Sequence, residues 1–215
     1  MCGIVGFTGS AQAAPILLDG LSKLEYRGYD SAGIAVYDGK RIDIEKCVGR
    51  LQALRIKIQG HEPQGTVGIG HTRWATHGEP NDINSHPHVS QNGKIAVVHN
   101  GIIENYLEIR EFLQEKGVQF TSQTDSEVVA QLMEYCMGLP EVSTVSDALY
   151  MVLHRIEGAY ALGILCSDDP DHIYAARKDA PLLLGFGKGE NFIASDVTAL
   201  VKYLSLIHIS EPTRP

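Results

Sequence analysis

The strand-like and helix-like segments of this sequence occur in separate blocks rather than in alternation. Short apolar runs typical of strands come first, at residues 2–7, 33–37, 41–48, 66–71 and 95–99, with one helix-like stretch at 15–24. Helix-like stretches follow at 101–117, 125–137 and 146–156, and four further strand-like runs at 159–166, 172–176, 182–186 and 191–194. Parallel βαβ folds alternate their elements, so this order favours an α+β fold with antiparallel sheets covered by helices.

Local patterns predict where some of these segments begin and end. The Asp-Gly pair at 38–39 predicts a tight hairpin, because both residues tolerate positive φ. The helix at 101–117 is expected to begin at Gly101 and to end at Gly117. Thr124 and Glu127 have the spacing of a capping box, which predicts that Thr124 caps the next helix.

Cysteine occupies position 2, directly before the first strand-like run. Removal of Met1 would leave a residue with both a thiol and a free α-amine, whose pKa values of about 8.5 and about 8 allow proton transfer between them at little cost. N-terminal amines activate nucleophiles in this way. The alternative is an ordinary strand cysteine that contributes only to packing.

Length, charge and cysteine use exclude several classes of protein. The 215 residues suit one large domain with a proper core. A net charge of -8 without a basic stripe argues against a nucleic-acid partner. The four cysteines lie far apart, which suits the reducing cytoplasm. No signal-peptide pattern and no run of about 18 apolar residues is present, so neither export nor membrane insertion is expected.

Three polar positions can carry chemistry, and each has a structural alternative. Arg73 follows a strand-like run and can hold a carboxylate through two parallel N–H bonds, or form a weak surface ion pair. Asn100-Gly101 at the next strand end can stabilise an oxyanion, or form a common Asn-Gly turn. Asp125 can bind an ammonium group, or interact with the dipole of the helix that follows.

Two further patterns suggest ligands that the sequence does not otherwise support. Histidines cluster at positions 71, 77, 86, 88 and 99, but their spacing is not that of a zinc site, so no metal is expected and several are interpreted as hydrogen-bonding loop residues. The glycine-rich segment 185–189 lacks the spacing of a phosphate-binding loop and is interpreted as a hairpin turn.

Five motifs taken together resemble the class II glutamine amidotransferases, in the form of the glutaminase domain of the glucosamine-6-phosphate synthase family. They are CGIVG from Cys2, LEYRGYDSAG at 24–33, GHTRWATHG at 70–78, HNG at 99–101 and TDSE at 124–127. The resemblance covers residues 2–203. It implies the four-layer αββα sandwich of N-terminal nucleophile hydrolases, with L-glutamine as substrate and no cofactor.

The resemblance also implies a role for each matching residue. Cys2 would be the nucleophile toward the glutamine side-chain amide, with Asn100 and the Gly101 N–H as the oxyanion hole. The rest of the implied glutamine pocket is Arg73 for the α-carboxylate, Asp125 for the α-ammonium, Thr76, His77, and Trp74 on a loop that closes over the site.

The family pattern breaks towards the end of the sequence. The full-length enzymes carry a sugar-phosphate isomerase domain and are expected to be homodimers, and this second domain has no counterpart here. Residues 204–215 depart from the family pattern and are expected to be a foreign tail outside the domain at 1–203. The alternatives to a glutaminase are another N-terminal cysteine amide hydrolase, a non-catalytic binding or metal protein, and an inactive fragment.

Overall fold

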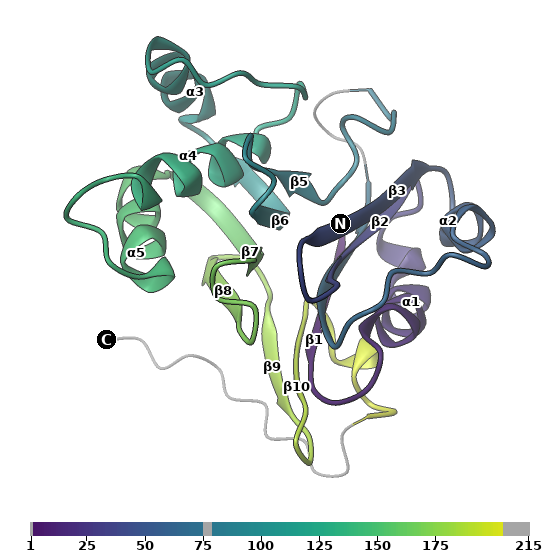
Figure 1. The fold of residues 1–215 in the computed structure, drawn as a ribbon. Coiled ribbons are helices and arrows are strands. Elements are labelled where there is room, and N and C mark those ends of the chain that lie inside the picture. The colour runs from purple at the N-terminus through teal and green to yellow at the C-terminus, as the bar shows by residue number, and fades with distance from the viewer. Residues whose placement is uncertain (1, 75–78, 204–215) are drawn as a thin grey trace.

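The computed structural model describes residues 2–74 and 79–203. Two antiparallel sheets lie face to face, and helices cover the outer side of each sheet (Figure 1). The block order of the sequence is therefore confirmed as a four-layer αββα arrangement. No helix in the described ranges has the length and apolar character needed to cross a membrane.

The first sheet has six strands in the order β3-β2-β4-β1-β10-β9. Their bounds are Gly3–Thr8 for β1, Ser31–Tyr37 for β2, Ile42–Val48 for β3, Val67–Arg73 for β4, Leu183–Phe186 for β9 and Asn191–Ala194 for β10. Helices α1 (Ala13–Ser22) and α2 (Leu51–Lys57) cover its outer face, and short 3-10 turns occur at η1 (Glu25–Arg27) and η2 (Val197–Ala199). The sequence patterns did not predict α2.

The second sheet has four strands in the order β5-β6-β7-β8. Their bounds are His88–Val89 for β5, Ile95–Ile103 for β6, Gly158–Cys166 for β7 and Ile173–Lys178 for β8. Helices α3 (Tyr106–Glu115), α4 (Glu127–Met137) and α5 (Val145–Arg155) pack on its outer face.

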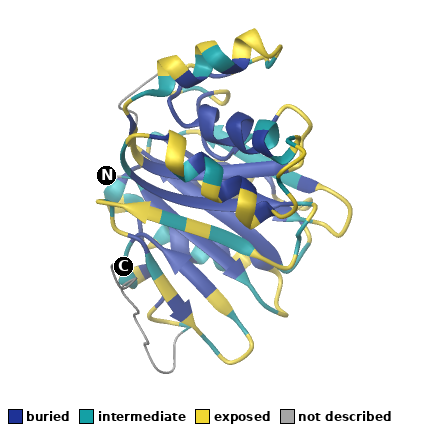
Figure 2. Ribbon diagram, turned by 90° about the vertical axis from the view of Figure 1, so that its left-hand side faces the viewer, coloured by how far each residue is buried: buried dark blue, intermediate teal, exposed yellow. Residues whose placement is uncertain are grey.

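Three apolar cores hold these layers together, one between the two sheets and one under each helical layer. Strand β1 contributes to two of them, because Ile4 faces the second sheet while Val5 and Phe7 face α1. The central strands are accordingly buried on both sides, as the dark blue ribbons in Figure 2 show. The residue before β1 is thus attached to a strand that is packed on both faces.

Two hairpins form as predicted, but one helix boundary was wrong. Residues 38–41, which include the Asp-Gly pair, join β2 to β3, and residues 187–190 join β9 to β10. Strand β6 continues through Ile103, and α3 begins only at Tyr106. Residues 101–103 pair with residues 158–160 of β7, and this long-range pairing overrides the local helical periodicity. The predicted stop at Gly117 holds, since α3 ends two residues before it.

The predicted capping box of α4 was also wrong. Ser126 is the N-cap residue and makes no capping hydrogen bond through its side chain. The Glu127 carboxylate instead accepts the backbone N–H groups of Thr121 and Ser122, while the Thr124 hydroxyl contacts a histidine ring. A complete capping box is found on α5, between Thr144 and Asp147.

Candidate active site

Cys2 lies beside a pocket at the point where strands from both sheets end. The antiparallel pairing of β1 with β4 places Gly3 opposite Thr72, so that Cys2 reaches the end of β4. The pocket is small, with a cavity volume of about 30 Å³, and is partly open to solvent. The residues that line it are Cys2, Arg73, Trp74, His86, His99, Gly101, Thr124, Asp125 and Ser126.

The thiol of Cys2 is held against the backbone of Trp74. The Trp74 N–H donates to Cys2 Sγ at 3.2 Å, and the Trp74 carbonyl oxygen lies 3.6 Å from the same sulfur. Burial raises the pKa of the thiol, and the Trp74 N–H lowers it only in part. The free thiol is therefore protonated at neutral pH and needs a base to become a nucleophile.

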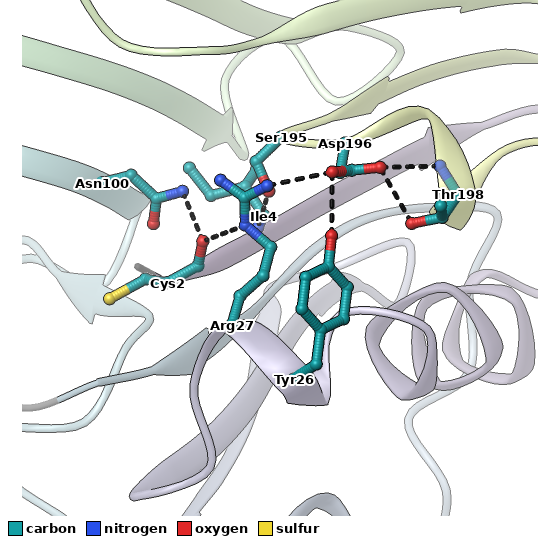
Figure 3. Close-up of polar contacts among 8 residues, drawn as sticks. All are labelled: Cys2, Ile4, Tyr26, Arg27, Asn100, Ser195, Asp196 and Thr198. Carbon is teal, nitrogen blue, oxygen red and sulfur yellow. Dashed lines mark hydrogen bonds and ion pairs between the residues drawn. The ribbon is translucent and has the colours of Figure 1, made fainter.

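The backbone of Cys2 is held by two side chains that meet at its carbonyl oxygen (Figure 3). Asn100 Nδ2 donates to this oxygen at 3.1 Å, and Arg27 Nε donates to it at 3.3 Å. Arg27 is in turn fixed by Asp196, whose Oδ2 lies 3.0 Å from Arg27 Nη1 and also accepts the Tyr26 hydroxyl at 2.9 Å. The start of β1 is thus tied to η1 and to the segment after β10.

Asn100 and Gly101 stand beside Cys2, as the sequence predicted. An amide NH2 has two hydrogens, so Asn100 can bind the Cys2 carbonyl and still offer a second donor. Gly101 has a φ of +122°, and a Cβ there would overlap the carbonyl oxygen of Ala159. Only glycine can occupy this position without displacing β7. The Asn-Gly pair is part of strand β6 and not a turn, while its role as an oxyanion hole stays a prediction.

Arg73 and Asp125 supply opposite charges to the same pocket. Arg73 is only 4% exposed, and its burial lowers the pKa of the guanidinium while Cys2 and Asp125 oppose this shift. Asp125 is 7% exposed, and its Oδ2 accepts the Ile103 N–H at 2.9 Å. Both side chains are buried, so the surface ion pair considered for Arg73 was wrong. One cation and one anion in one pocket match the two ends of an amino acid.

Comparison with known proteins agrees with this arrangement. A family model described as a glutamine amidotransferase domain matches residues 71–202, which is more than half of the chain. The chain belongs to the glutamine amidotransferase domain family. The matched residues include Arg73, Asn100, Gly101 and Asp125 of the pocket.

Curated relatives of this glutamine amidotransferase domain are named glutamine–fructose-6-phosphate aminotransferase (isomerizing). The protein of Caldanaerobacter subterraneus subsp. tengcongensis is 61% identical over 203 residues, which are 94% of this chain and 33% of the relative. That of Clostridium tetani is 51% identical over 209 residues, covering 97% of this chain and 34% of the relative. The chain therefore spans about a third of the length of the curated relatives that it matches.

Solved structures place the glutamine amidotransferase domain in the expected fold class. The glutamine phosphoribosylpyrophosphate amidotransferase of B. subtilis superposes with a TM-score of 0.80 at 28% identity, over 93% of this chain and 43% of that one. A class-II glutamine aminotransferase domain protein from Silicibacter pomeroyi, at 15% identity and a TM-score of 0.57, shares the fold. The predicted fold of the N-terminal nucleophile hydrolase type is confirmed.

Sequence reasoning missed a group of buried histidines in the amidotransferase domain. His71, His86, His88 and His99 were interpreted in part as loop residues, yet all four are buried. The rings of His71 and His86 are 4.1 Å apart, and those of His86 and His88 are 4.6 Å apart. Burial lowers the pKa of each imidazole, so all four are neutral at pH 7.

These histidines do not assemble a metal centre in the part of the chain that the structure describes. Within residues 2–74 and 79–203, no three His, Cys, Asp or Glu side chains are placed so that they could hold a metal ion. His86 and His99 instead line the pocket together with Thr124 and Ser126. The density of histidine in the sequence was the signal that could have found them. The predicted pocket residues Thr76 and His77 lie outside the described residues.

Proposed function

We propose that this chain hydrolyses the side-chain amide of L-glutamine to glutamate and ammonia, with Cys2 as the nucleophile. The observation that carries the proposal is the meeting of four features around Cys2: its thiol, an amide donor beside a glycine, a buried cation and a buried anion. A zwitterionic amino acid needs both charges, and an amide that is to be cleaved needs the thiol and the donors. The groups come from the start of β1, the end of β4, strand β6 and the segment before α4.

The reaction begins with loss of a proton from the Cys2 thiol. Because burial raises the pKa of this thiol, a base must take the proton. The α-amine of Cys2 serves this purpose once Met1 is removed, since its pKa of about 8 lies near neutral pH. The same ammonium then returns the proton to the leaving nitrogen.

The thiolate attacks the amide carbon and forms a tetrahedral intermediate. Its oxyanion accepts the second Asn100 N–H and the Gly101 N–H, which have to lie about 3 Å from the developing charge. The carbon–nitrogen bond breaks, ammonia leaves, and a thioester to Cys2 remains. Water then attacks the thioester carbon, releases glutamate and returns the free thiol.

Arg73 and Asp125 bind the amino-acid end of glutamine. The guanidinium takes the α-carboxylate through two N–H groups, and the Asp125 carboxylate takes the α-ammonium. Trp74 lies at the mouth of the pocket, 45% exposed, with its ring edge-on to Tyr29 at 5.7 Å. In this proposal Trp74 closes over bound glutamine.

The ammonia released here feeds a second reaction. The relatives named glutamine–fructose-6-phosphate aminotransferase are about three times as long as this chain, so we propose that an isomerase domain uses the ammonia to aminate fructose 6-phosphate. In that full-length cytoplasmic enzyme the chain acts as the glutaminase part of a homodimer.

Hydrolysis of another amide by the same N-terminal cysteine is the less favoured alternative. An acylase that acts on apolar amides would have no use for a buried arginine and a buried aspartate in its pocket. Comparing glutamine with butyramide as substrates for the native chain and for Arg73→Ala separates the two. If the chain is a glutaminase, native protein cleaves glutamine faster than butyramide, and Arg73→Ala loses this preference. If it is an acylase, both proteins cleave butyramide faster than glutamine.

The direct test measures glutamate release from glutamine by protein whose intact mass confirms removal of Met1. Cys2→Ala is expected to abolish activity, while Cys47→Ala, a half-buried cysteine away from the pocket, keeps it. The form that retains Met1 is expected to be inactive, because its Cys2 nitrogen is an amide. Glutamate release by Cys2→Ala, or no release by the native chain without Met1, would overturn the proposal.

A further inference from the structure

Asn100 can stabilise an oxyanion only if its NH2 group, and not its oxygen, faces Cys2. The two ends of an amide side chain have nearly the same shape, so packing alone does not select one orientation. In the structure Nδ2 points at the Cys2 carbonyl, and Oδ1 lies 3.0 Å from Nε2 of His71. Two partners therefore select the orientation of the amide: the Cys2 carbonyl oxygen, which can only accept, requires Nδ2 on its side, and Oδ1 requires a donor on the side of His71.

The protonation of His71 is set by a backbone carbonyl group. His71 Nε2 also lies 3.0 Å from the carbonyl oxygen of His99, which can only accept a hydrogen bond. Nε2 must accordingly carry the hydrogen. A hydrogen on Nε2 requires an acceptor at Asn100, so Oδ1 is held toward His71 and Nδ2 is left toward Cys2.

The surroundings of His71 keep it in this state. The ring is buried and packs in a tilted contact on His86, with 4.1 Å between the ring centroids. Within residues 2–74 and 79–203, no group forms a hydrogen bond with its Nδ1. Burial lowers the pKa of His71 to about 3, so the imidazole stays neutral and keeps the Nε2–H form across the physiological range. A charged ring would add a donor at Nδ1, and no group among the described residues accepts a hydrogen bond there.

We propose that His71 is a positioning residue that orients the Asn100 amide, through its Nε2–H, so that the NH2 group faces the nucleophile. This inference rests on the proposed glutaminase function and assigns a role to a histidine that does not line the pocket. His71 acts on the reaction only through Asn100. A series of hydrogen bonds runs from the His99 carbonyl through His71 and Asn100 to the Cys2 carbonyl. Each acceptor in this series requires a donor on the next group.

The kinetic test is a double-mutant cycle between His71 and Asn100. His71→Phe keeps an aromatic ring against His86 but removes the donor, whereas His71→Gln keeps an N–H near the position of Nε2. His71→Phe is expected to lower kcat for glutamine at least about 10-fold with KM within about twofold, because one oxyanion donor is worth about 10²–10³ in kcat. His71→Gln is expected to restore most of kcat. In the Asn100→Ala background, His71→Phe is expected to cost nothing further.

His88 provides the matched control. It is equally buried in the same histidine group, but its Nε2 contacts Thr124 and it makes no hydrogen bond to Asn100. The fold-reduction in kcat caused by His88→Phe is expected to be the same in the native and in the Asn100→Ala background. If His71→Phe likewise costs the same in both backgrounds, His71 acts through packing alone and the proposal is overturned.

A measurement without substrate separates this inference from the proposed function. Two-bond ¹⁵N–¹H spectra of the full chain labelled on histidine report the tautomer of each ring, and His71→Gln identifies the signal of His71. The Nε2–H form, unchanged from pH 6 to pH 8, is expected. The Nδ1–H form overturns the inference even if the chain is an active glutaminase. If the chain releases no glutamate, the proposed function fails, while this spectrum still decides how Asn100 is oriented.

Discussion

The backbone N–H of Trp74 donates to the sulfur of Cys2 across 3.2 Å, which joins the end of β4 to the start of β1. This contact follows from the antiparallel pairing of the two strands. Gly3 lies opposite Thr72, so Cys2, which precedes Gly3, comes close to the residues that follow Thr72. The N–H favours the thiolate, but the burial of Cys2 disfavours it more strongly. The balance leaves a protonated thiol that is already held in position.

The reactivity of Cys2 is therefore expected to rise with pH. Burial raises the thiol pKa above its ordinary value, so the thiolate fraction is expected to increase throughout the range from pH 7 to pH 9. The rate of alkylation by iodoacetamide at Cys2, followed by intact mass, is expected to climb from pH 7 to pH 9 without a plateau. Cys136, fully buried in α4, serves as the unreactive control. A plateau below pH 8 would contradict the raised pKa.

Replacing Asp196 by asparagine is expected to slow the reaction without unfolding the protein. Asparagine keeps the acceptor that binds the Thr198 N–H at 3.0 Å but removes the negative charge that holds Arg27. With Arg27 released, the Cys2 carbonyl loses one of its two donors, and a fall in kcat of about 10-fold is expected from the displaced nucleophile.

Asp19→Asn is the control for this experiment. Asp19 forms a comparable pair with Lys202 and accepts the Tyr203 hydroxyl, but it does not line the pocket. Its replacement is expected to leave kcat unchanged. Equal losses in the two variants would show that Asp196 has no specific link to Cys2.

Gly101→Ala is expected to cost far more than alanine at another glycine with positive φ. At Gly101 a Cβ meets the Ala159 carbonyl, so β6 and β7 must separate, and a loss of at least about 3 kcal/mol in unfolding free energy is expected. Gly93 has a φ of +76° with open space around it, and Gly93→Ala is expected to cost about 1 kcal/mol. Urea unfolding of both variants measures the difference, and similar losses would argue against the close approach.

The protein is expected to lose stability steeply below pH 6.5. The four buried histidines have lowered pKa values in the folded state, whereas in the unfolded chain they take up protons near pH 6.5. Below that pH the unfolded state binds more protons, so each histidine reduces the unfolding free energy by up to about 1.4 kcal/mol per pH unit. This loss continues down to the folded-state pKa.

Urea unfolding at pH 7 and at pH 5 measures the effect. His71→Gln removes one of the four histidines that take up a proton in the unfolded state. It is expected to reduce the slope of unfolding free energy against pH by up to about 1.4 kcal/mol per pH unit. Equal stability at pH 7 and pH 5 would contradict the neutral state of the buried rings.

Much of the candidate site could be predicted from single residues whose side chains have distinctive chemistry. Cys2, Arg73 and Asp125 each suggested a role from residue type and from position at a segment end. Asn100 and Gly101 were found in the same way, and the structure brings all five together. The helix start at Gly101 was wrong, because residues 101–103 pair with a strand more than fifty positions away.

The sequence by itself determined most of the order of strands and helices, the hairpin at the Asp-Gly pair and the residue types of the pocket, since these depend on periodicity and local backbone preference. Only the tertiary structure decided that Asp196 holds Arg27, that Glu127 binds the preceding loop, and that His71 orients Asn100. These contacts depend on burial and on strand register between distant segments. Both arise when the two sheets close on each other, and neither leaves a periodic pattern in the chain.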